Sequence, residues 1–190
     1  MWQRMQARAV AVAAGNESEV IWSCEHEPVY TTGRRGVDNR TQPDLGAPLI
    51  ATDRGGETTF HGPGQLMLYP VINLRTRGIS PRAYVALLED ACMSLLLDHG
   101  VQSERKCGLP GVWTEEGKIA ALGLRISHGV AYHGMALNVS VDLSWFRRIN
   151  PCGTGQAAVS LEQYAPGGPS PEKLAAQWAG RLQSKLGLSG

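Results

Sequence analysis

Four cysteines are the candidate nucleophiles of the chain, and their sequence surroundings differ. Cys152 lies between a proline and a glycine, which is typical of a turn. Cys92 falls on the apolar stripe of a predicted helix, and Cys24 ends a predicted strand, so both are expected in the core. Cys107 is ambiguous. Since a reactive thiol must be accessible and easily deprotonated, Cys152 is the best candidate nucleophile.

Lys118 is the candidate base, because it stands at the head of the apolar stretch 119–123. A lysine at this place is usually an exposed end of a strand. A partly desolvated lysine can instead accept and return a proton. Both interpretations remain open at the level of sequence.

Residues 54–65, RGGETTFHGPGQ, carry four glycines and several polar side chains between two apolar runs. Glycines allow a backbone to approach a ligand where a Cβ would block it. The alternative is a tight turn with a hydrogen-bonded histidine. The pattern matches neither GxxxxGK[ST] nor GxGxxG, so it indicates no nucleotide.

No metal site is predicted. His128 and His133 are five residues apart across a predicted turn, without an acidic partner. His133 sits among apolar strand residues, where a histidine is more often structural than catalytic. No two cysteines have the CxxC spacing of zinc ribbons and thioredoxins.

The elements that must hold these residues form a mixed α+β pattern. Ser80-Pro81 and Ser170-Pro171 each predict a helix start, with serine as the N-cap and proline in the first turn. The first helix is expected to end at Gly100. Strands are predicted over 9–14 and 19–24 as a hairpin, over 66–74, and over 118–126 and 130–139 as a second hairpin. A long loop is predicted over 30–48, and the regular βαβ alternation of doubly wound folds is missing.

Composition favours one folded domain. The 190 residues are 43% hydrophobic and 18% charged, which excludes disorder and coiled coils, and we expect a single domain over 1–190. A net charge of +1 points to neither a nucleic-acid nor a membrane partner. The arginine clusters 34–35 with 40, and 147–148, are either solvated faces or docking patches. The N-terminal apolar stretch is too short for a signal peptide, so a cytoplasmic protein with reduced thiols is expected.

Taken together, these motifs resemble those of the lipoyl(octanoyl) transferases, the lipoate-protein ligase B family. The resemblance covers most of the chain: EHEPVYTTG from Glu25, RGGETTFHGPGQL, GVW, GKIAALGLR, YHGMALNV, DLSWF and NPCG. Glu27 departs from the pattern, because the family more often has proline there. The departure concerns loop stiffness and says little about catalysis.

The resemblance implies transfer of an octanoyl group from octanoyl-acyl carrier protein to a lysine of a lipoyl domain, through a cysteine thioester and without a cofactor. The acceptors it implies are lipoyl domains of 2-oxoacid dehydrogenase E2 subunits and the glycine cleavage H protein. The acylated cysteine of the family matches Cys152, and the lysine that lowers its pKa matches Lys118. The substrate-binding stretches match Arg54, Gly55, Gly56, Glu57, Thr58, Thr59, Phe60 and His61, then Ala121, Leu122 and Gly123, then Gly134, Met135 and Ala136.

The implied fold is the α+β (α/β) domain of the biotin and lipoate ligases, a mixed, largely antiparallel sheet flanked by helices. Two other functions remain open. One is an ATP-dependent lipoate or biotin ligase of the same fold, although an adenylating ligase needs no cysteine at this turn. The other is a non-catalytic acyl-binding relative, against which the intact Cys152 and Lys118 argue.

Overall fold

The computed structural model describes residues 1–36, 45–149 and 157–188, and its main feature is a six-stranded antiparallel sheet in the order β1-β5-β9-β8-β7-β6. A smaller sheet has the order β3-β2-β4, with β3 parallel to β2 and β4 antiparallel to it. The described elements are α1 (Trp2–Ala13), β1 (Val20–Cys24), β2 (Val29–Thr32), β3 (Leu49–Ala51), β4 (Thr58–His61), β5 (Gln65–Asn73), α2 (Pro81–Asp98), β6 (Glu104–Lys106), β7 (Leu109–Trp113), β8 (Lys118–Ser127), β9 (Val130–Asn138), the 3-10 helix η2 (Leu143–Arg148), α3 (Leu161–Tyr164) and α4 (Pro171–Leu186).

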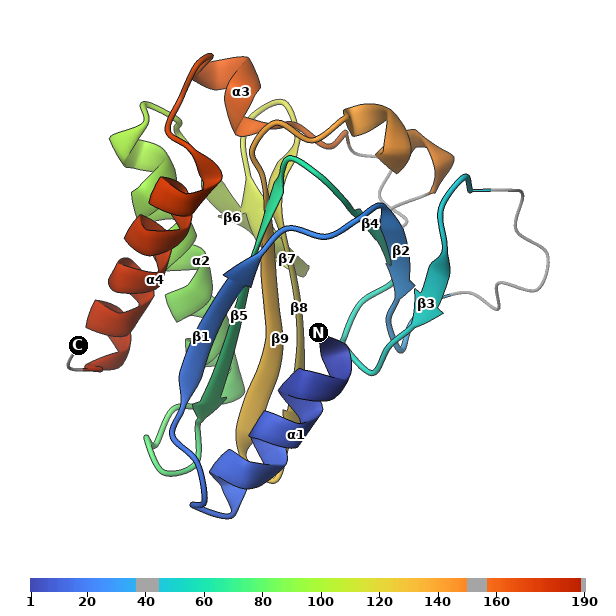
Figure 1. Cartoon of the computed structure of the whole chain (residues 1–190). Helices are drawn as coiled ribbons and strands as arrows, with labels where there is room; N and C mark the ends of the chain where they lie inside the picture. Colours follow the sequence, from blue (N-terminus) through green and yellow to red (C-terminus); the bar gives the residue numbers. More distant parts are fainter. Residues whose placement is uncertain (37–44, 150–156, 189–190) are drawn as a thin grey trace.

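Helices cover both faces of the six-stranded sheet, so the predicted architecture is confirmed (Figure 1). Successive side chains of a strand point to opposite faces of its sheet, and β5 packs against helices on both faces. Leu68 and Ile72 pack in the core under α2 and α4, whereas Met67 and Val71 pack under α1. Because neither face is open to water, every residue of β5 and β9 is buried.

The two long helices begin where the sequence predicts. The Ser80 hydroxyl accepts a hydrogen bond from the Ala83 N–H at 3.2 Å, and the Ser170 hydroxyl accepts one from the Lys173 N–H at 3.4 Å. Each cap pairs one of the N–H groups that a helix start leaves without a partner. None of the described helices is long and apolar enough to cross a membrane.

The predicted strand over 9–14 is wrong: this segment belongs to helix α1. Its buried residues Met5, Ala9 and Val12 recur at intervals of four and three, the spacing of a helix face. The alternating Ala and Val residues mimic a strand over a few positions only. The second half of that predicted hairpin is β1 and is confirmed.

The hairpin of β8 and β9 is confirmed, with Ser127 paired to Val130 across a two-residue turn. His128 and Gly129 have φ values of 53° and 84°, and a type I′ hairpin turn requires positive φ at both of its central positions.

The loop predicted over 30–48 is only partly correct, because β2 takes its first residues. Residues 37–44 of that loop lie outside the described residues. The apolar run 48–52 contains β3. Beneath this small sheet, Tyr30, Phe60 and Phe146 form a separate apolar cluster, which fixes the sheet beside the pocket described below.

Candidate functional site

Strand register brings two of the predicted substrate-binding stretches together. Ala121 pairs with Ala136, Leu122 with Met135 and Gly123 with Gly134 across β8 and β9. All six residues line a pocket of about 960 Å³ between the two sheets. The pocket has the volume typical of small-molecule sites, which reach about 1,000 Å³.

The glycine-rich loop lies directly on β8. The Gly55 N–H donates to the Leu124 carbonyl at 2.8 Å. A Cβ at position 123 would lie 3.1 Å from the Gly55 oxygen and 3.1 Å from Arg54 Cδ. A Cβ at position 134 would overlap the Leu68 carbonyl of β5. Glycines at these two places therefore permit close approach of backbones, which the sequence motif predicts.

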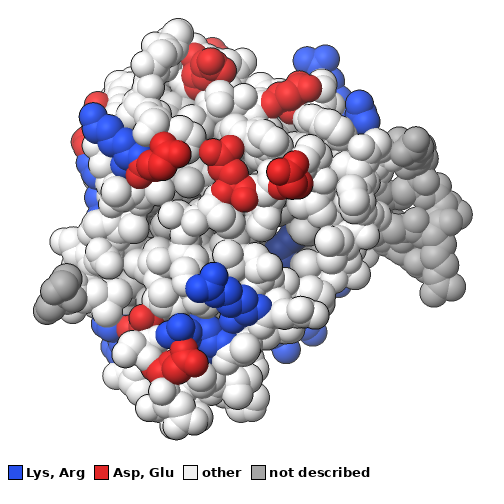
Figure 2. Space-filling view, in the orientation of Figure 1, with Lys and Arg blue, Asp and Glu red and all other residues white. Residues whose placement is uncertain are grey.

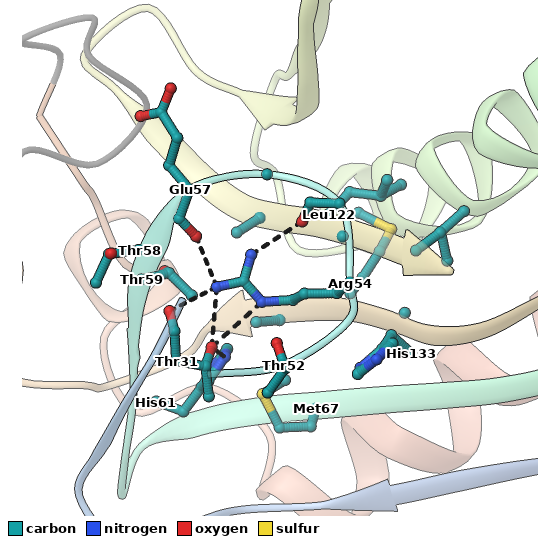
Figure 3. Close-up of a pocket in the computed structure, with 18 of the residues that line it drawn as sticks. Thr31, Thr52, Arg54, Glu57, Thr58, Thr59, His61, Met67, Leu122 and His133 are labelled. Carbon is teal, nitrogen blue, oxygen red and sulfur yellow. Dashed lines mark hydrogen bonds between the residues drawn. The ribbon is translucent and has the colours of Figure 1, made fainter. Parts of the chain in front are cut away.

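Arg54 organises its own loop (Figure 3). Its Nη2 donates to the carbonyl oxygens of Thr31 and Glu57, at 2.6 and 2.8 Å, and its Nη1 donates to the Gly55 carbonyl at 3.0 Å. Nε and Nη2 both donate to Thr31 Oγ1, at 3.2 and 2.9 Å. The guanidinium thus joins β2 to the loop and closes one side of the pocket.

Among the predicted substrate-binding residues, Phe60 is the one that does not line the pocket. It is fully buried and stacks on Trp145 at 4.8 Å between ring centroids. The other residues of the stretch 54–61 all line the pocket. Phe60 therefore supports the wall of the site from the far side of β4.

Asp53 precedes this loop and accepts hydrogen bonds from side chains of two elements, α1 and β9. Trp2 Nε1 of α1 donates to Oδ1 at 2.8 Å, His133 Nε2 lies 2.7 Å from Oδ1, and the Tyr132 hydroxyl donates to Oδ2. Burial alone would raise the pKa of Asp53, but the hydrogen bonds from His133, Tyr132 and Trp2 outweigh it and lower the pKa to about 2.

His133 keeps its ring in the pocket wall by an uncommon backbone conformation, with φ of 62°. Burial lowers its pKa, although Asp53 opposes the shift. His133 is therefore neutral at pH 7 and donates its Nε2–H to the Asp53 carboxylate. The structure thus gives His133 an acidic partner, where the sequence indicated none, and this hydrogen bond holds Asp53 beside the loop.

Lys118 begins β8 and its side chain is half-buried in the pocket lining, so it is not a fully exposed end of a strand. Its Nζ lies 4.5 Å from the centroid of the Trp113 ring and donates to the Pro110 carbonyl at 3.2 Å. On its backbone, the N–H donates to the Ala157 carbonyl at 2.9 Å, and the carbonyl accepts from the Val159 N–H at 3.1 Å.

Cys152, the candidate nucleophile, lies outside the described residues. The other three cysteines are free thiols: Cys92 is buried, Cys24 is half-buried and Cys107 is exposed. Burial raises the pKa of both the Cys92 and the Cys24 thiol, which makes each a poor nucleophile. Within the described ranges, no three His, Cys, Asp or Glu side chains are grouped to hold a metal ion.

Sequence reasoning missed several residues of the pocket wall, namely Trp2, His26, Thr31, Met67 and Trp113. His26 Nε2 lies 2.8 Å from the Tyr69 hydroxyl, and burial lowers its pKa. Trp2 and Met67 carry no chemical signature in the sequence. His26, Thr31 and Trp113 belong to motifs that the resemblance quotes, which was the available signal.

The α+β fold that holds this pocket and its glycine-rich loop is shared with known proteins. Residues 2–183 match the model of the lipoyl protein ligase A/B catalytic domain. Among solved structures, the bipartite lipoate protein ligase of Thermoplasma acidophilum has a TM-score of 0.71 at 16% identity, over 97% of this chain and 79% of that one. The biotin protein ligase of Aquifex aeolicus has a TM-score of 0.57 at 16% identity, over 83% and 70%.

Comparison with curated relatives identifies the group within this family. The chain is 49% identical to an octanoyltransferase of Aromatoleum aromaticum, over 80% of this chain and 65% of that protein. It is 45% identical to an octanoyltransferase of Azoarcus sp., over 87% and 74%. The chain belongs to the lipoyl protein ligase A/B family and, within it, to the octanoyltransferases.

Proposed function

We propose that this octanoyltransferase passes the octanoyl group through a thioester on Cys152, with Lys118 as the proton carrier. One observation supports the pairing above all. Described residues on both sides of Cys152 line the pocket, Phe146 before it and Ala157 and Ala158 after it. Ala157 follows Cys152 by five residues and is hydrogen-bonded to the backbone of Lys118.

The first step exchanges one thioester for another. The Cys152 thiolate attacks the donor's thioester carbonyl, the bond from carbonyl carbon to donor sulfur breaks, and the donor thiolate leaves with a proton from Lys118. Because the bonds formed and broken are of the same kind, this step needs no ATP. A nearby ammonium increases the thiolate fraction of a cysteine, whose pKa is ordinarily about 8.5.

The second step forms an amide. The acceptor's lysine amine attacks the acyl-cysteine carbonyl, Lys118 takes the proton of that amine, and the Cys152 thiolate leaves. We propose octanoyl-acyl carrier protein as the donor. Lipoyl domains of 2-oxoacid dehydrogenase E2 subunits and the glycine cleavage H protein are the proposed acceptors, and the cytoplasm is the proposed compartment.

The pocket wall suits an aliphatic chain. Ala121, Gly123, Gly134 and Ala136 leave room beside the sheet, and Met67 and Met135 add flexible apolar surface. We place the acyl chain along this wall.

Mass spectrometry tests the thioester. Purified protein incubated with octanoyl-acyl carrier protein should gain the mass of one octanoyl group. Cys152→Ala should gain none, and Cys152→Ser should turn over very slowly because an alkoxide forms far less readily than a thiolate. The control is Cys107→Ala, which removes an exposed thiol and should still be labelled.

Two results would contradict the proposal. Labelling that persists in Cys152→Ala would place the acyl group elsewhere. Transfer that requires ATP would favour the ligase reaction considered from the sequence.

A further inference from the structure

Four polar side chains link the glycine-rich loop to the segment that pairs with Lys118. Thr31 Oγ1 lies 3.2 Å from His61 Nε2, and His61 Nδ1 lies 2.7 Å from Gln65 Oε1. Gln65 Nε2 donates to Asn138 Oδ1 at 2.9 Å, and Asn138 Nδ2 donates to the Val159 carbonyl at 2.9 Å. We call Thr31, His61, Gln65 and Asn138 the polar chain.

The far end of the polar chain determines the direction of its hydrogen bonds. The Val159 carbonyl can only accept, so Asn138 must present its NH₂ group there and its oxygen to Gln65. Gln65 must then turn its NH₂ group to Asn138 and its oxygen to His61. An amide oxygen can only accept, so the proton of His61 is on Nδ1.

The near end leads independently to the same tautomer. Arg54 donates twice to Thr31 Oγ1, so the hydroxyl hydrogen of Thr31 is available for His61 Nε2. Burial lowers the pKa of His61 to about 3, so the ring is neutral and Nε2 is an acceptor. Both ends of the polar chain thus agree on one arrangement of donors and acceptors.

Val159 connects the polar chain to Lys118. Its carbonyl accepts from Asn138, while its N–H donates to the Lys118 carbonyl. Gln65, Asn138 and His61 are each at most 7% exposed, so water offers little substitute for a lost partner. Loss of the hydrogen bond between Asn138 and Val159 should therefore shift the segment that pairs with the backbone of Lys118.

We infer that Gln65 and Asn138 are positioning residues for octanoyl transfer. Their hydrogen bonds, which all run in one direction, orient Val159, and Val159 in turn orients Lys118. The inference rests on the proposed role of Lys118. Neither side chain needs to touch the reacting atoms.

Isosteric substitutions test the direction of the series. Gln65→Glu still accepts from His61 but has no N–H for Asn138, and Asn138→Asp still accepts from Gln65 but has none for Val159. We expect kcat to fall about tenfold to a hundredfold in each, as for small misplacements of catalytic groups, with the KM for the octanoyl donor within about twofold.

The pH profile separates positioning from simple loss of stability. In Asn138→Asp, a protonated carboxyl can again donate to the Val159 carbonyl. The ratio of its kcat to that of the wild type should therefore rise as the pH falls. The rate is measured per folded molecule, with the folded fraction taken from unfolding curves.

The matched control is Asn73→Asp. Asn73 is 7% exposed, against 5% for Asn138. It lies at the end of β5 opposite Gln65, where its Oδ1 accepts a hydrogen bond from the Thr76 N–H. This variant also buries a carboxylate, so it should lose stability and keep its kcat.

Nitrogen NMR of the wild type tests the series without any variant and should find the His61 proton on Nδ1. A proton on Nε2, a wild-type kcat in Gln65→Glu and Asn138→Asp, or an equal loss of kcat in Asn73→Asp would overturn the inference. If Cys152→Ala remained labelled while both isosteric variants lost kcat, the proposed nucleophile would fail and the positioning role would stand.

Discussion

Among the described residues, the face of the Trp113 ring and the Pro110 carbonyl contact the Lys118 ammonium. A cation over an aromatic face gains electrostatic stabilisation, and the carbonyl gives it a direction. These contacts restrict the position of Nζ. The proposed role requires an ammonium held in place, because a nearby positive charge raises the thiolate fraction of a cysteine.

Lys118→Ala should move the midpoint of Cys152 alkylation to higher pH, because only the thiolate reacts and the nearby ammonium is gone. Octanoyl transfer should fall about a hundredfold or more with the loss of acid–base catalysis. Lys118→Arg should retain part of the thiolate stabilisation and still transfer poorly, since a guanidinium does not release its proton. An unchanged midpoint in Lys118→Ala would refute the pairing.

Asp53 makes the free energy of unfolding depend on pH in the acid range. Its pKa in the folded protein is about 2, below the ordinary value of 3.8. Between these two pH values the unfolded chain therefore binds more protons at Asp53 than the folded protein does. The contribution is present above pH 4 and is lost as the pH falls toward 2. Asp53→Asn should lower the free energy of unfolding at pH 7 by about 1 kcal/mol, a figure reduced for partial exposure.

Urea unfolding at several pH values measures this effect. The wild-type and Asp53→Asn curves should converge as the pH falls from 4 to 2. Asp98→Asn is the control, because its carboxylate pairs with Arg181 at the surface and is worth about 0.5 kcal/mol or less. Curves that stay parallel down to pH 2 would contradict the role of Asp53.

Helix α1 shows how an element remote in sequence completes the site. Its buried residues pack on β5 and β9, and Trp2 at its start lines the pocket and binds Asp53. The same helix therefore covers one face of the six-stranded sheet (Figure 1) and, through Trp2, holds Asp53, the residue before the glycine-rich loop.

Val10 and Val12 distinguish the observed helix from the strand that the sequence indicated. In a strand, residues two apart share a face, whereas in a helix they point in nearly opposite directions. Val12 is 6% exposed and Val10 is 66% exposed. Val12→Ala should cost about 1–2 kcal/mol of unfolding free energy and Val10→Ala about 0.5 kcal/mol or less. Equal losses in denaturant titrations would contradict the helix.

At the scale of the whole molecule, residues from both sheets and from α1 line the pocket, and they span the chain from Met1 to Ala158. That residues 1–190 form a single catalytic domain stays a prediction. The face in Figure 2 carries acidic and basic side chains in small separate groups, in keeping with a net charge of +1. Arg34 and Arg35 are exposed where they border the pocket, and either solvation or docking remains open for them.

The proposed acyl-cysteine intermediate predicts ping-pong kinetics. The donor must leave before the acceptor reaches the acyl group on Cys152. Initial rates measured against donor concentration at several acceptor concentrations should give parallel double-reciprocal lines. Intersecting lines would indicate that both partners bind together and would contradict the acyl-enzyme intermediate.

Sequence by itself determined the elements that local rules govern. Ser80 and Ser170 start helices through their own caps, and the turn at His128 and Gly129 sets the register of β8 and β9. That register alone places Gly123 beside Gly134. The motifs around Arg54 and Lys118 also carried enough local information to indicate the family.

Only the tertiary structure decided the remaining features, because they depend on partners distant in the chain. Phe60 stands within the predicted binding stretch, yet it packs on Trp145 because the small sheet buries that side of β4. The tautomer of His61 is determined by a carbonyl 98 residues away, at Val159. The short segment 9–14 fits both a strand and a helix pattern, and the packing of Met5, Ala9 and Val12 on the sheet face that carries Met67 and Val71 decides for helix α1.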